Sequence, residues 1–556
     1  MKVTSVLKIL TLFLCMPLVV KAQEEKWEKP AGGIENAQVV IEKDKIISLR
    51  PVSRRFKAIQ IELPQAQAIL FNHEFATTVD TLSSLQVIVR PKTMKDQPLE
   101  KLHGLNAKLG YGNYRSPFIL LNAGNKRSDE YLYNLQFNHF SSGKGSINDA
   151  GYYSTRAGLD GKLYWNNVSM SSSLNFHNQV YENYGYDPAE YINYPDQDFL
   201  KQKLNNLSFL IALEENNQKN SVDQNFGLSI NYLSNNHFDK EFILGFDYDI
   251  NWFPVEEWKF SLPASFNLIN QNGRGGNGIS RHFASMKPVI GYTLNKFIFT
   301  GGANAFYYKD PINNLESKFN IFPNVGVTYQ ASSSLRAAVM VSGGLERITQ
   351  QTLYSENLYL DSLIEANHNV NDFSAKIEID GKLTETIGYS LGYQFLHYKR
   401  MMFYDNNPID SGRFQVVYDE GGVRLQQFKA AINYLRNEHL NFTLSGVYNL
   451  YNTTDVITAW HKPKAELHFV TNLFVLKKLH TRLSYNLLYG IEARTSAGAI
   501  KTLDLVNDLN IGFDLEITER VGVFLDLRNI FGQNYQIYNN YPVNGFQFVA
   551  GIGIHF

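Results

Sequence analysis

The last twelve residues of the chain, Gly545-Phe-Gln-Phe-Val-Ala-Gly-Ile-Gly-Ile-His-Phe556, alternate between two kinds of side chain. Every second residue is apolar, from Phe546 through Ile552 to Phe556, and the residues between them are mostly small or polar. A period of two indicates a β-strand with one apolar face. Soluble sheets seldom leave such a face uncovered, whereas lipid covers the outer face of a transmembrane β-barrel.

The same alternation recurs from about Leu105 to the end of the chain. In the segment 505–517, for example, Leu509, Ile511 and Phe513 alternate with acidic and amide residues. A slip of one residue would turn the acids into lipid, so the register of each strand is strongly specified. Counting such segments predicts an all-β fold: a transmembrane antiparallel β-barrel of about 22 strands whose C-terminal strand closes on the first.

The predicted connections between strands alternate in length. Short turns are expected at 166–167, 294–296, 384–386 and 518–520, and long loops at 180–203, 347–372, 401–421 and 531–545. Outer-membrane barrels place short turns in the periplasm and long loops outside the cell. We therefore expect the protein in the outer membrane of a Gram-negative cell, with its C-terminus in the periplasm.

The first 22 residues have the pattern of a secretory signal peptide. Lys2 and Lys8 precede an apolar run, and Ala22 ends a small-residue cleavage site. The alternative is a lipoprotein acylated at Cys15, the single cysteine of the chain. No later apolar run reaches the roughly 18 residues that a membrane helix needs.

Composition excludes several classes of function. The chain has 37 Phe and 33 Tyr, which suits many strands with aromatic belts. Three of its 52 basic residues are lysines of the leader, so the rest of the chain has 49 basic and 53 acidic residues. It has no cluster of basic residues that would indicate binding of nucleic acid. Neither catalytic, cofactor-binding nor metal-ligating residues can be picked out, so no enzyme activity is predicted.

The hairpin before the C-terminus carries a more specific signal. Its pattern resembles the closing signature of the TonB-dependent receptor family of outer-membrane barrels, and the end of the last strand resembles the terminal-aromatic signal that the barrel-assembly machinery reads. The residues that carry the first resemblance are Leu527-Arg528-Asn529-Ile530-Phe531, Tyr535, Pro542, Gly545, Phe548, Gly551 and Phe556. Those implied for the assembly signal are Phe548, Ile552, Ile554 and Phe556.

The resemblance covers the predicted barrel, residues 101–556, and not the segment that precedes it. Receptors of this family carry an N-terminal plug, roughly twice as long as residues 23–100, that fills the barrel. Residues 23–100 lack the glycine-rich pattern that ends a standard plug. They are predicted to be a short periplasmic or lumenal segment, either a reduced plug or a docking arm.

Two sets of residues are candidates for binding. A tyrosine-rich loop is predicted either to bind a ligand or partner or to form an aromatic rim at the lipid headgroups; its residues are Tyr181, Tyr184, Tyr186, Tyr191 and Tyr194. Charged residues on the inward face of the strands are predicted to form the lumen wall: Asp247, Asp249, Asp504, Asp508, Asp514, Asp526 and Arg528.

Two functions follow. The resemblance implies a receptor or transporter that binds or imports a ligand at the cell surface, with TonB as its partner. The short N-terminal segment favours a barrel that does not transport and that serves as a scaffold or assembly partner for outer-membrane lipoproteins. A passive porin is a third possibility, although porins have fewer strands.

Overall fold

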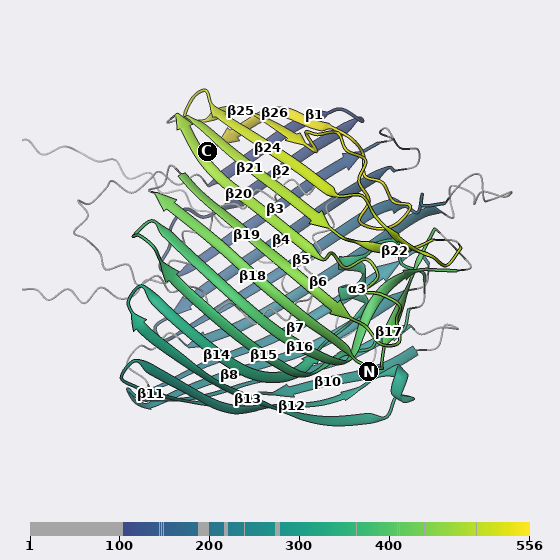
Figure 1. Ribbon diagram of the computed structural model, residues 1–556. Coiled ribbons are helices and arrows are strands. Elements are labelled where there is room, and N and C mark those ends of the chain that lie inside the picture. The colour runs from purple at the N-terminus through teal and green to yellow at the C-terminus, as the bar shows by residue number, and fades with distance from the viewer. Residues whose placement is uncertain are drawn as a thin grey trace, which may run out of the picture. The chain divides into compact units, whose positions relative to one another are not determined.

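The strands form a closed antiparallel barrel of 22 strands, in which the last strand pairs with the first (Figure 1). Strand β26 (Gln547–His555) runs antiparallel to β1 (Leu105–Gly112) and lies in register from Asn106 opposite His555 to Gly112 opposite Val549. Closure removes the unpaired edges that hydrocarbon would not tolerate. The predicted fold class and the predicted closure are confirmed.

The computed structural model describes residues 104–143, 145, 147, 150–186, 200–215, 221–237, 239–272, 278–362, 364–408, 410, 412–436, 440–476, 478–495 and 497–556. The predicted signal peptide (1–22) with its cleavage site at Ala22, and the segment 23–100, lie outside these residues. Among the described residues, none of the helices has the length and apolarity needed to cross a membrane.

Each barrel strand pairs with its neighbours in chain order. The strands between β1 and β26 are β2 (Ser116–Gly124), β3 (Tyr131–Ser142), β4 (Tyr152–Trp165), β5 (Val168–Glu182), β6 (Lys201–Glu215), β7 (Val222–Asn235), β8 (Lys240–Val255), β9 (Trp258–Asn272), β10 (Gly278–Met286), β11 (Val289–Leu294), β12 (Phe297–Lys309), β13 (Ser317–Ser332), β14 (Leu335–Glu346), β15 (Asn369–Lys382), β16 (Ile387–Asn406), β18 (Val423–Arg436), β19 (Leu440–Asn452), β20 (Ala465–Leu476), β21 (Leu479–Tyr489), β24 (Val506–Glu516) and β25 (Val521–Arg528).

Two prolines interrupt the ladders in different ways. Strands β10 and β11 both pair with β9 and β12 and form one barrel strand, broken at Lys287 and Pro288. Pro323 lies in β13 opposite Ala303 of β12, one residue before the β13–β14 ladder begins at Asn324. Proline has no backbone N–H, but at this position no ladder hydrogen bond is lost.

The two faces of the wall differ as the alternation predicts. On β7 and β8, the outward Phe226 and Phe246 are 40% and 37% exposed. Ser229 of β7 and Asp247 of β8 belong to the opposite face of these strands and line a cavity on the inner side. Water thus reaches one face of the wall, while the other presents the apolar band that lipid covers.

The two ends of the barrel also differ. All four predicted short turns join strands at one end, called here the short-turn end, where the carbonyl oxygen of Phe556 accepts the N–H of Leu105 at 3.0 Å. The long loops lie at the other end, called the long-loop end. There they carry the small elements η2 (Pro311–Asn313), α3 (Gln350–Glu356), β17 (Phe414–Asp419), β22 (Glu492–Arg494) and β23 (Ile500–Thr502). Figure 1 shows α3, β17 and β22 together at the end opposite the C-terminus.

One predicted loop is in large part β-structure. Residues 401–421 were expected to be a long loop, but β16 continues to Asn406 and its last residues pair with β17, from Met401 opposite Asp419 to Asn406 opposite Phe414. Met402, Phe403 and Tyr404 are all nearly fully buried. Consecutive buried residues carry no alternation because protein covers both faces of this hairpin, so the pattern of a membrane strand could not reveal it.

The opposite environments of the two faces give a direct test. Leu228→Arg, which shares the outward parity of Phe226, should destabilise the folded barrel in lipid vesicles by about 2–4 kcal/mol, because the charge enters lipid near the midplane. Ser229→Arg, one residue further along β7, places the same charge in the lumen near Asp247 and should cost less than about 1 kcal/mol. Urea titration followed by heat-modifiable gel mobility measures both. Equal losses for the two variants would contradict the assigned faces.

Candidate functional site

The loops at the long-loop end pack into one buried core, which we call the loop core. It joins the ends of strands from several sides of the barrel to the loops between them. Its buried apolar residues are Tyr181, Leu204, Leu233, Ile348, Leu353, Tyr354, Leu358, Tyr359, Leu360, Ala366, Met402, Tyr404, Phe414, Leu488, Ile491, Ala493, Leu503, Val506, Tyr535, Ile537, Tyr538 and Tyr541. Burial of this many apolar side chains makes the loop core a folded unit rather than a set of independent loops.

Helix α3 is anchored to the barrel wall at its N-terminus. Thr349 is the N-cap, and its hydroxyl accepts the N–H of Thr352 at 3.1 Å. Glu241, at the start of β8, accepts the N–H groups of Gln350 and Gln351 through its two carboxylate oxygens, both at 2.9 Å. A carboxylate is favoured there because the first N–H groups of a helix have no partner within the helix and carry partial positive charge.

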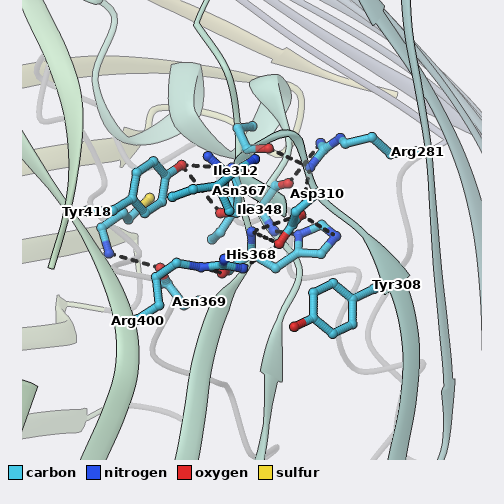
Figure 2. Close-up of polar contacts among 12 residues, drawn as sticks. Arg281, Tyr308, Asp310, Ile312, Ile348, Asn367, His368, Asn369, Arg400 and Tyr418 are labelled. Carbon is cyan, nitrogen blue, oxygen red and sulfur yellow. Dashed lines mark hydrogen bonds and ion pairs between the residues drawn. The ribbon is translucent and has the colours of Figure 1, made fainter. Parts of the chain in front are cut away.

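A fully buried carboxylate connects three strands to the loop 347–368 (Figure 2). Asp310, which follows β12, is bound by Arg400 of β16 and lies 3.6 Å from Nη1 of Arg281 of β10. The backbone N–H of His368 also points at the carboxylate, at 3.3 Å from each oxygen. Burial raises the pKa of Asp310 above its ordinary value, and the two guanidinium groups and the N–H, which favour the charged form, offset part of this cost.

The same two arginines hold both ends of the loop 347–368. Arg281 donates to the carbonyl oxygens of Ile348 at 3.2 Å and Ala366 at 2.6 Å, and Nε of Arg400 donates to that of His368 at 2.8 Å. Nδ1 of His368 accepts the N–H of Ile348 at 3.0 Å. Burial, together with the positive charges of Arg281 and Arg400, lowers the pKa of His368 well below its ordinary value, so this histidine is neutral.

Aromatic rings join loops that start on different sides of the barrel. Tyr359 of the loop 347–368 stacks on Tyr541 of the loop 529–546, with ring centroids 3.5 Å apart. Tyr538 donates its hydroxyl to the carbonyl oxygen of Glu356 at 2.9 Å and packs edge-on against Phe414 of β17. The loops after β14, β16 and β25 therefore meet and are fixed to one another.

A second buried histidine, His461, packs against Phe414 and Tyr538 of the loop core. Nδ1 of His461 lies 2.7 Å from the carbonyl oxygen of Tyr404, and Nε2 accepts the N–H of Asn539 at 3.3 Å. This pattern requires the neutral ring, with its proton on Nδ1. Burial lowers the pKa of His461 to about 4 from its ordinary 6.5.

Three of the five predicted loop tyrosines fall in or beside the loop core. Tyr181 and Tyr186 are buried and Tyr184 is half-buried, with its hydroxyl donating to the carbonyl oxygen of Pro542 at 2.9 Å. Tyr191 and Tyr194 lie outside the described residues. The structure brings Tyr181 and Tyr184 together at Tyr359, with ring centroids 6.0 Å from it in each case.

The predicted lumen-wall residues occupy three places. Asp247 lines a cavity of about 250 Å³ with Ser229, Ser265, Asn267 and Arg347, and Asp249 follows on the same face of β8. Asp504 precedes β24 and is exposed in the loop before it. Asp508, Asp514, Asp526 and Arg528 lie on β24 and β25, on the face opposite the apolar band.

Two of these acids belong to an ion network where the barrel closes. Asp514 binds both Lys108 of β1 and Arg482 of β21, and Arg482 lies 3.3 Å from Asp526 of β25. The network spans β21, β24, β25 and β1, so it ties the last strands to the first. The alternation of residues around Lys108 predicts that it lies on the inner face. This pattern could have identified Lys108 as a lumen-wall residue.

Sequence reasoning missed the cluster around Asp310. Asp310 and Arg400 are 90 positions apart in the sequence, and the residues of the cluster come from a strand, two loop positions and a second strand. No spacing rule joins such residues, because only the closure of the barrel brings them together. Within the described residues, no group of three or more His, Cys, Asp or Glu side chains is placed to hold a metal ion.

Solved structures with this fold are receptors and transporters. The FrpB iron transporter from Neisseria meningitidis (F3-3 variant) matches with a TM-score of 0.62 and 10% identity, over 82% of this chain and 82% of that one. The siderophore receptor PiuA from Acinetobacter baumannii matches with a TM-score of 0.60, 10% identity and the same coverage. The ferric-catecholate import receptor Fiu from E. coli K12 matches with a TM-score of 0.60 and 8% identity, again over 82% of each chain.

These structures are TonB-dependent receptors. The chain thus has the barrel fold of the family that its C-terminal hairpin resembles. No protein-family model matches the sequence, and no curated protein matches it.

The Asp310 cluster should determine how firmly the loop core is held. Asp310→Asn leaves two buried guanidinium groups without their shared carboxylate, which should cost about 3–5 kcal/mol. Protease cleavage within 347–368 should accelerate accordingly, while the barrel remains folded. Asp223→Asn, at an exposed position at the start of β7, is the control and should change stability by less than about 0.5 kcal/mol. Unchanged protection of 347–368 in Asp310→Asn would contradict the role given to the cluster.

Acid should loosen the loop core. His461 has an ordinary pKa of 6.5 and a folded-state pKa of about 4, so between these values the unfolded loop binds a proton that the folded one does not. Stability should therefore fall as the pH drops from 6.5 towards 4 and change little above 6.5. Hydrogen exchange of the amides of 453–464 at pH 7 and at pH 4.5 measures this. His461→Gln should reduce the pH dependence, and an unchanged dependence would argue against His461.

Proposed function

We propose that this protein is an outer-membrane receptor that binds a ligand at its long-loop end. The observation that carries the proposal is the loop core, in which Tyr359 and Tyr541 stack at 3.5 Å between loops from different sides of the barrel. A passive porin needs an open mouth, whereas loops fixed to one another across the mouth favour recognition at a defined surface.

The arrangement of turns and loops supports an orientation in the membrane. We infer that the short-turn end and the C-terminus face the periplasm and that the loop core faces the outside of the cell. The outward Phe548, Ile552, Ile554 and Phe556 of the last strand then supply the aromatic and apolar signal for the barrel-assembly machinery. Lipid of the outer membrane covers the rest of the apolar band.

The structures with the same fold suggest which ligand to test first. FrpB is an iron transporter, PiuA a siderophore receptor and Fiu a ferric-catecholate import receptor, so ferric siderophores are the first class to examine. Import, as distinct from binding, would need energy coupling through TonB, and in this proposal residues 23–100 provide that contact. Recognition and transport require no catalysis, and we propose no enzyme activity.

A second function is favoured by the way in which the loop core is held. The Asp310 cluster and the capped α3 fix the loop 347–368 at both ends, whereas a loop that must open for each transport cycle is drawn from the less stable parts of a structure. A fixed outer surface suits a barrel that serves as a scaffold for outer-membrane lipoproteins or for an assembly machine. The two functions share the barrel and differ in whether a ligand crosses it.

Deletion of residues 34–60 from the chromosomal copy separates the two functions. If the protein imports its ligand, the deletion strain should grow poorly when iron is supplied only as a ferric siderophore, and uptake of labelled iron by the parent should stop when the proton-motive force is dissipated. If it is a scaffold, growth on the siderophore should be normal and the outer membrane should leak, as measured by entry of a dye that an intact membrane excludes.

The deletion requires two controls. Immunoblots of outer-membrane fractions must show equal amounts of barrel, because a loss of assembly would mimic either defect. Binding of the ferric siderophore to whole cells should persist after the deletion, because the loop core is unchanged. A strain lacking the whole chain with no defect in uptake, surface binding or envelope integrity would refute both functions.

A further inference from the structure

A narrow pocket lies between the loop core and the inner face of the wall, where β25 ends. Its walls are largely tyrosine rings, contributed by the ends of β4 and β5 and by the loops 183–186, 347–368 and 529–546. Its volume of about 40 Å³ holds about three water molecules or one carboxylate or phosphate group. Arg528, the last residue of β25, lines it.

Arg528 is a buried cation with uncommitted donors. Its side chain is 3% exposed, and Nε and Nη1 have no hydrogen-bond partner among the described residues. Its guanidinium group lies 4.5 Å from the ring centroid of Phe140 on β3, which covers one face. Stacking of this kind holds the plane of a guanidinium group while its edge stays available for a planar or tetrahedral oxyanion.

The carboxylates near Arg528 do not neutralise it. Asp526, the acid whose charge acts on Arg528, is engaged with Arg482 at 3.3 Å. Glu182 also lines the pocket, but within the described part of the chain no ion pair joins it to Arg528. The contrast is with Arg281 and Arg400, which share the carboxylate of Asp310.

A buried charge without a partner is costly, and proteins seldom retain one without a counter-charge. A ligand that brings a negative charge to Nε and Nη1 would remove that cost and gain charge-assisted hydrogen bonds. Asn544 also lines the pocket, and its Oδ1 is buried without a hydrogen-bond partner among the described residues. A half-turn of the carboxamide presents its NH₂ to an anion instead.

The tyrosines shape the pocket rather than charge it. Tyr184 donates its hydroxyl to the carbonyl oxygen of Pro542 and Tyr541 donates its hydroxyl to that of Gly412, so neither hydroxyl is left to bind a ligand. Tyr152 and Gln547, both half-buried, also line the cavity. An anionic group would therefore enter towards Arg528, while an aromatic or apolar body stays against the tyrosines.

We propose that this pocket binds the carboxylate or phosphate of a small ligand, with Arg528 as the cation that recognises it. This names the chemistry of the ligand and so rests on the proposed receptor function. The experiment measures binding to purified protein and not uptake by cells. Absence of anion binding would therefore not refute the receptor function, and absence of a phenotype in the deletion strain would not refute the anion site.

The test uses the full mature chain in detergent and three probes of similar shape: benzoate, phenyl phosphate and the neutral benzamide. Wild-type protein should show a saturable rise in melting temperature with benzoate, phenyl phosphate or both, and none with benzamide. Arg528→Gln should weaken anion binding by at least about tenfold in calorimetry. Without ligand it should melt at the same temperature as wild type or higher, because it removes an unpaired buried charge.

Arg336→Gln is the matched control. Arg336 on β14 is paired with Asp380 and lies outside the pocket, so its variant should keep the full response to the anions. A response to benzoate alone identifies a carboxylate site, and a response to phenyl phosphate alone a phosphate site. The proposal fails if neither anion binds wild type, if benzamide binds as well as the anions, or if Arg528→Gln binds as wild type does. It also fails if Arg528→Gln melts lower, since Arg528 would then be a structural residue.

Discussion

Hydrocarbon supplies no hydrogen bonds to a polypeptide backbone, and the architecture of this protein follows from that constraint. Every strand must pair on both sides, so β26 returns to β1 and the wall closes. Each strand must also present apolar residues to lipid and polar residues to water, which explains why Phe246 and Asp247 are neighbours in the chain but face different media. The ion network of Lys108, Asp514 and Arg482 lies on the inner face, where it joins the first strand to the last ones.

The loop core is stabilised in a different way from the barrel wall. It lies beyond the band of alternating residues, so it can bury residues in succession, as in Met402, Phe403 and Tyr404. It also buries charge, and Asp310 shows how: two arginines and a backbone N–H satisfy one carboxylate, and the same arginines hold the loop 347–368. Arg528 breaks this rule, since it is buried without such a partner. This difference between the two sites is the basis for the anion site proposed at Arg528.

The barrel could be predicted from local patterns because lipid and water act on each strand separately. Alternation in segments such as 505–517 is enough to set the strand, its register and its faces, and turn length sets the two ends. The loop core could not be predicted in this way. Arg281, Asp310 and Arg400 meet only after the wall has closed, and no spacing in the sequence encodes that. The tyrosines near residue 184 were noticed for their composition, but their burial against Tyr359 depends on a loop more than 170 residues away.

The central claim is that the long loops form one folded core across the mouth of the barrel. Hydrogen exchange of the full chain in lipid nanodiscs, read by mass spectrometry at pH 7, tests it most directly. The amides of Gln350 and Gln351, bound by Glu241, and that of His368, directed at Asp310, should exchange on the slow timescale of the barrel strands. Exchange of the loop 347–368 within seconds, at the rate of an unstructured peptide, would contradict the account.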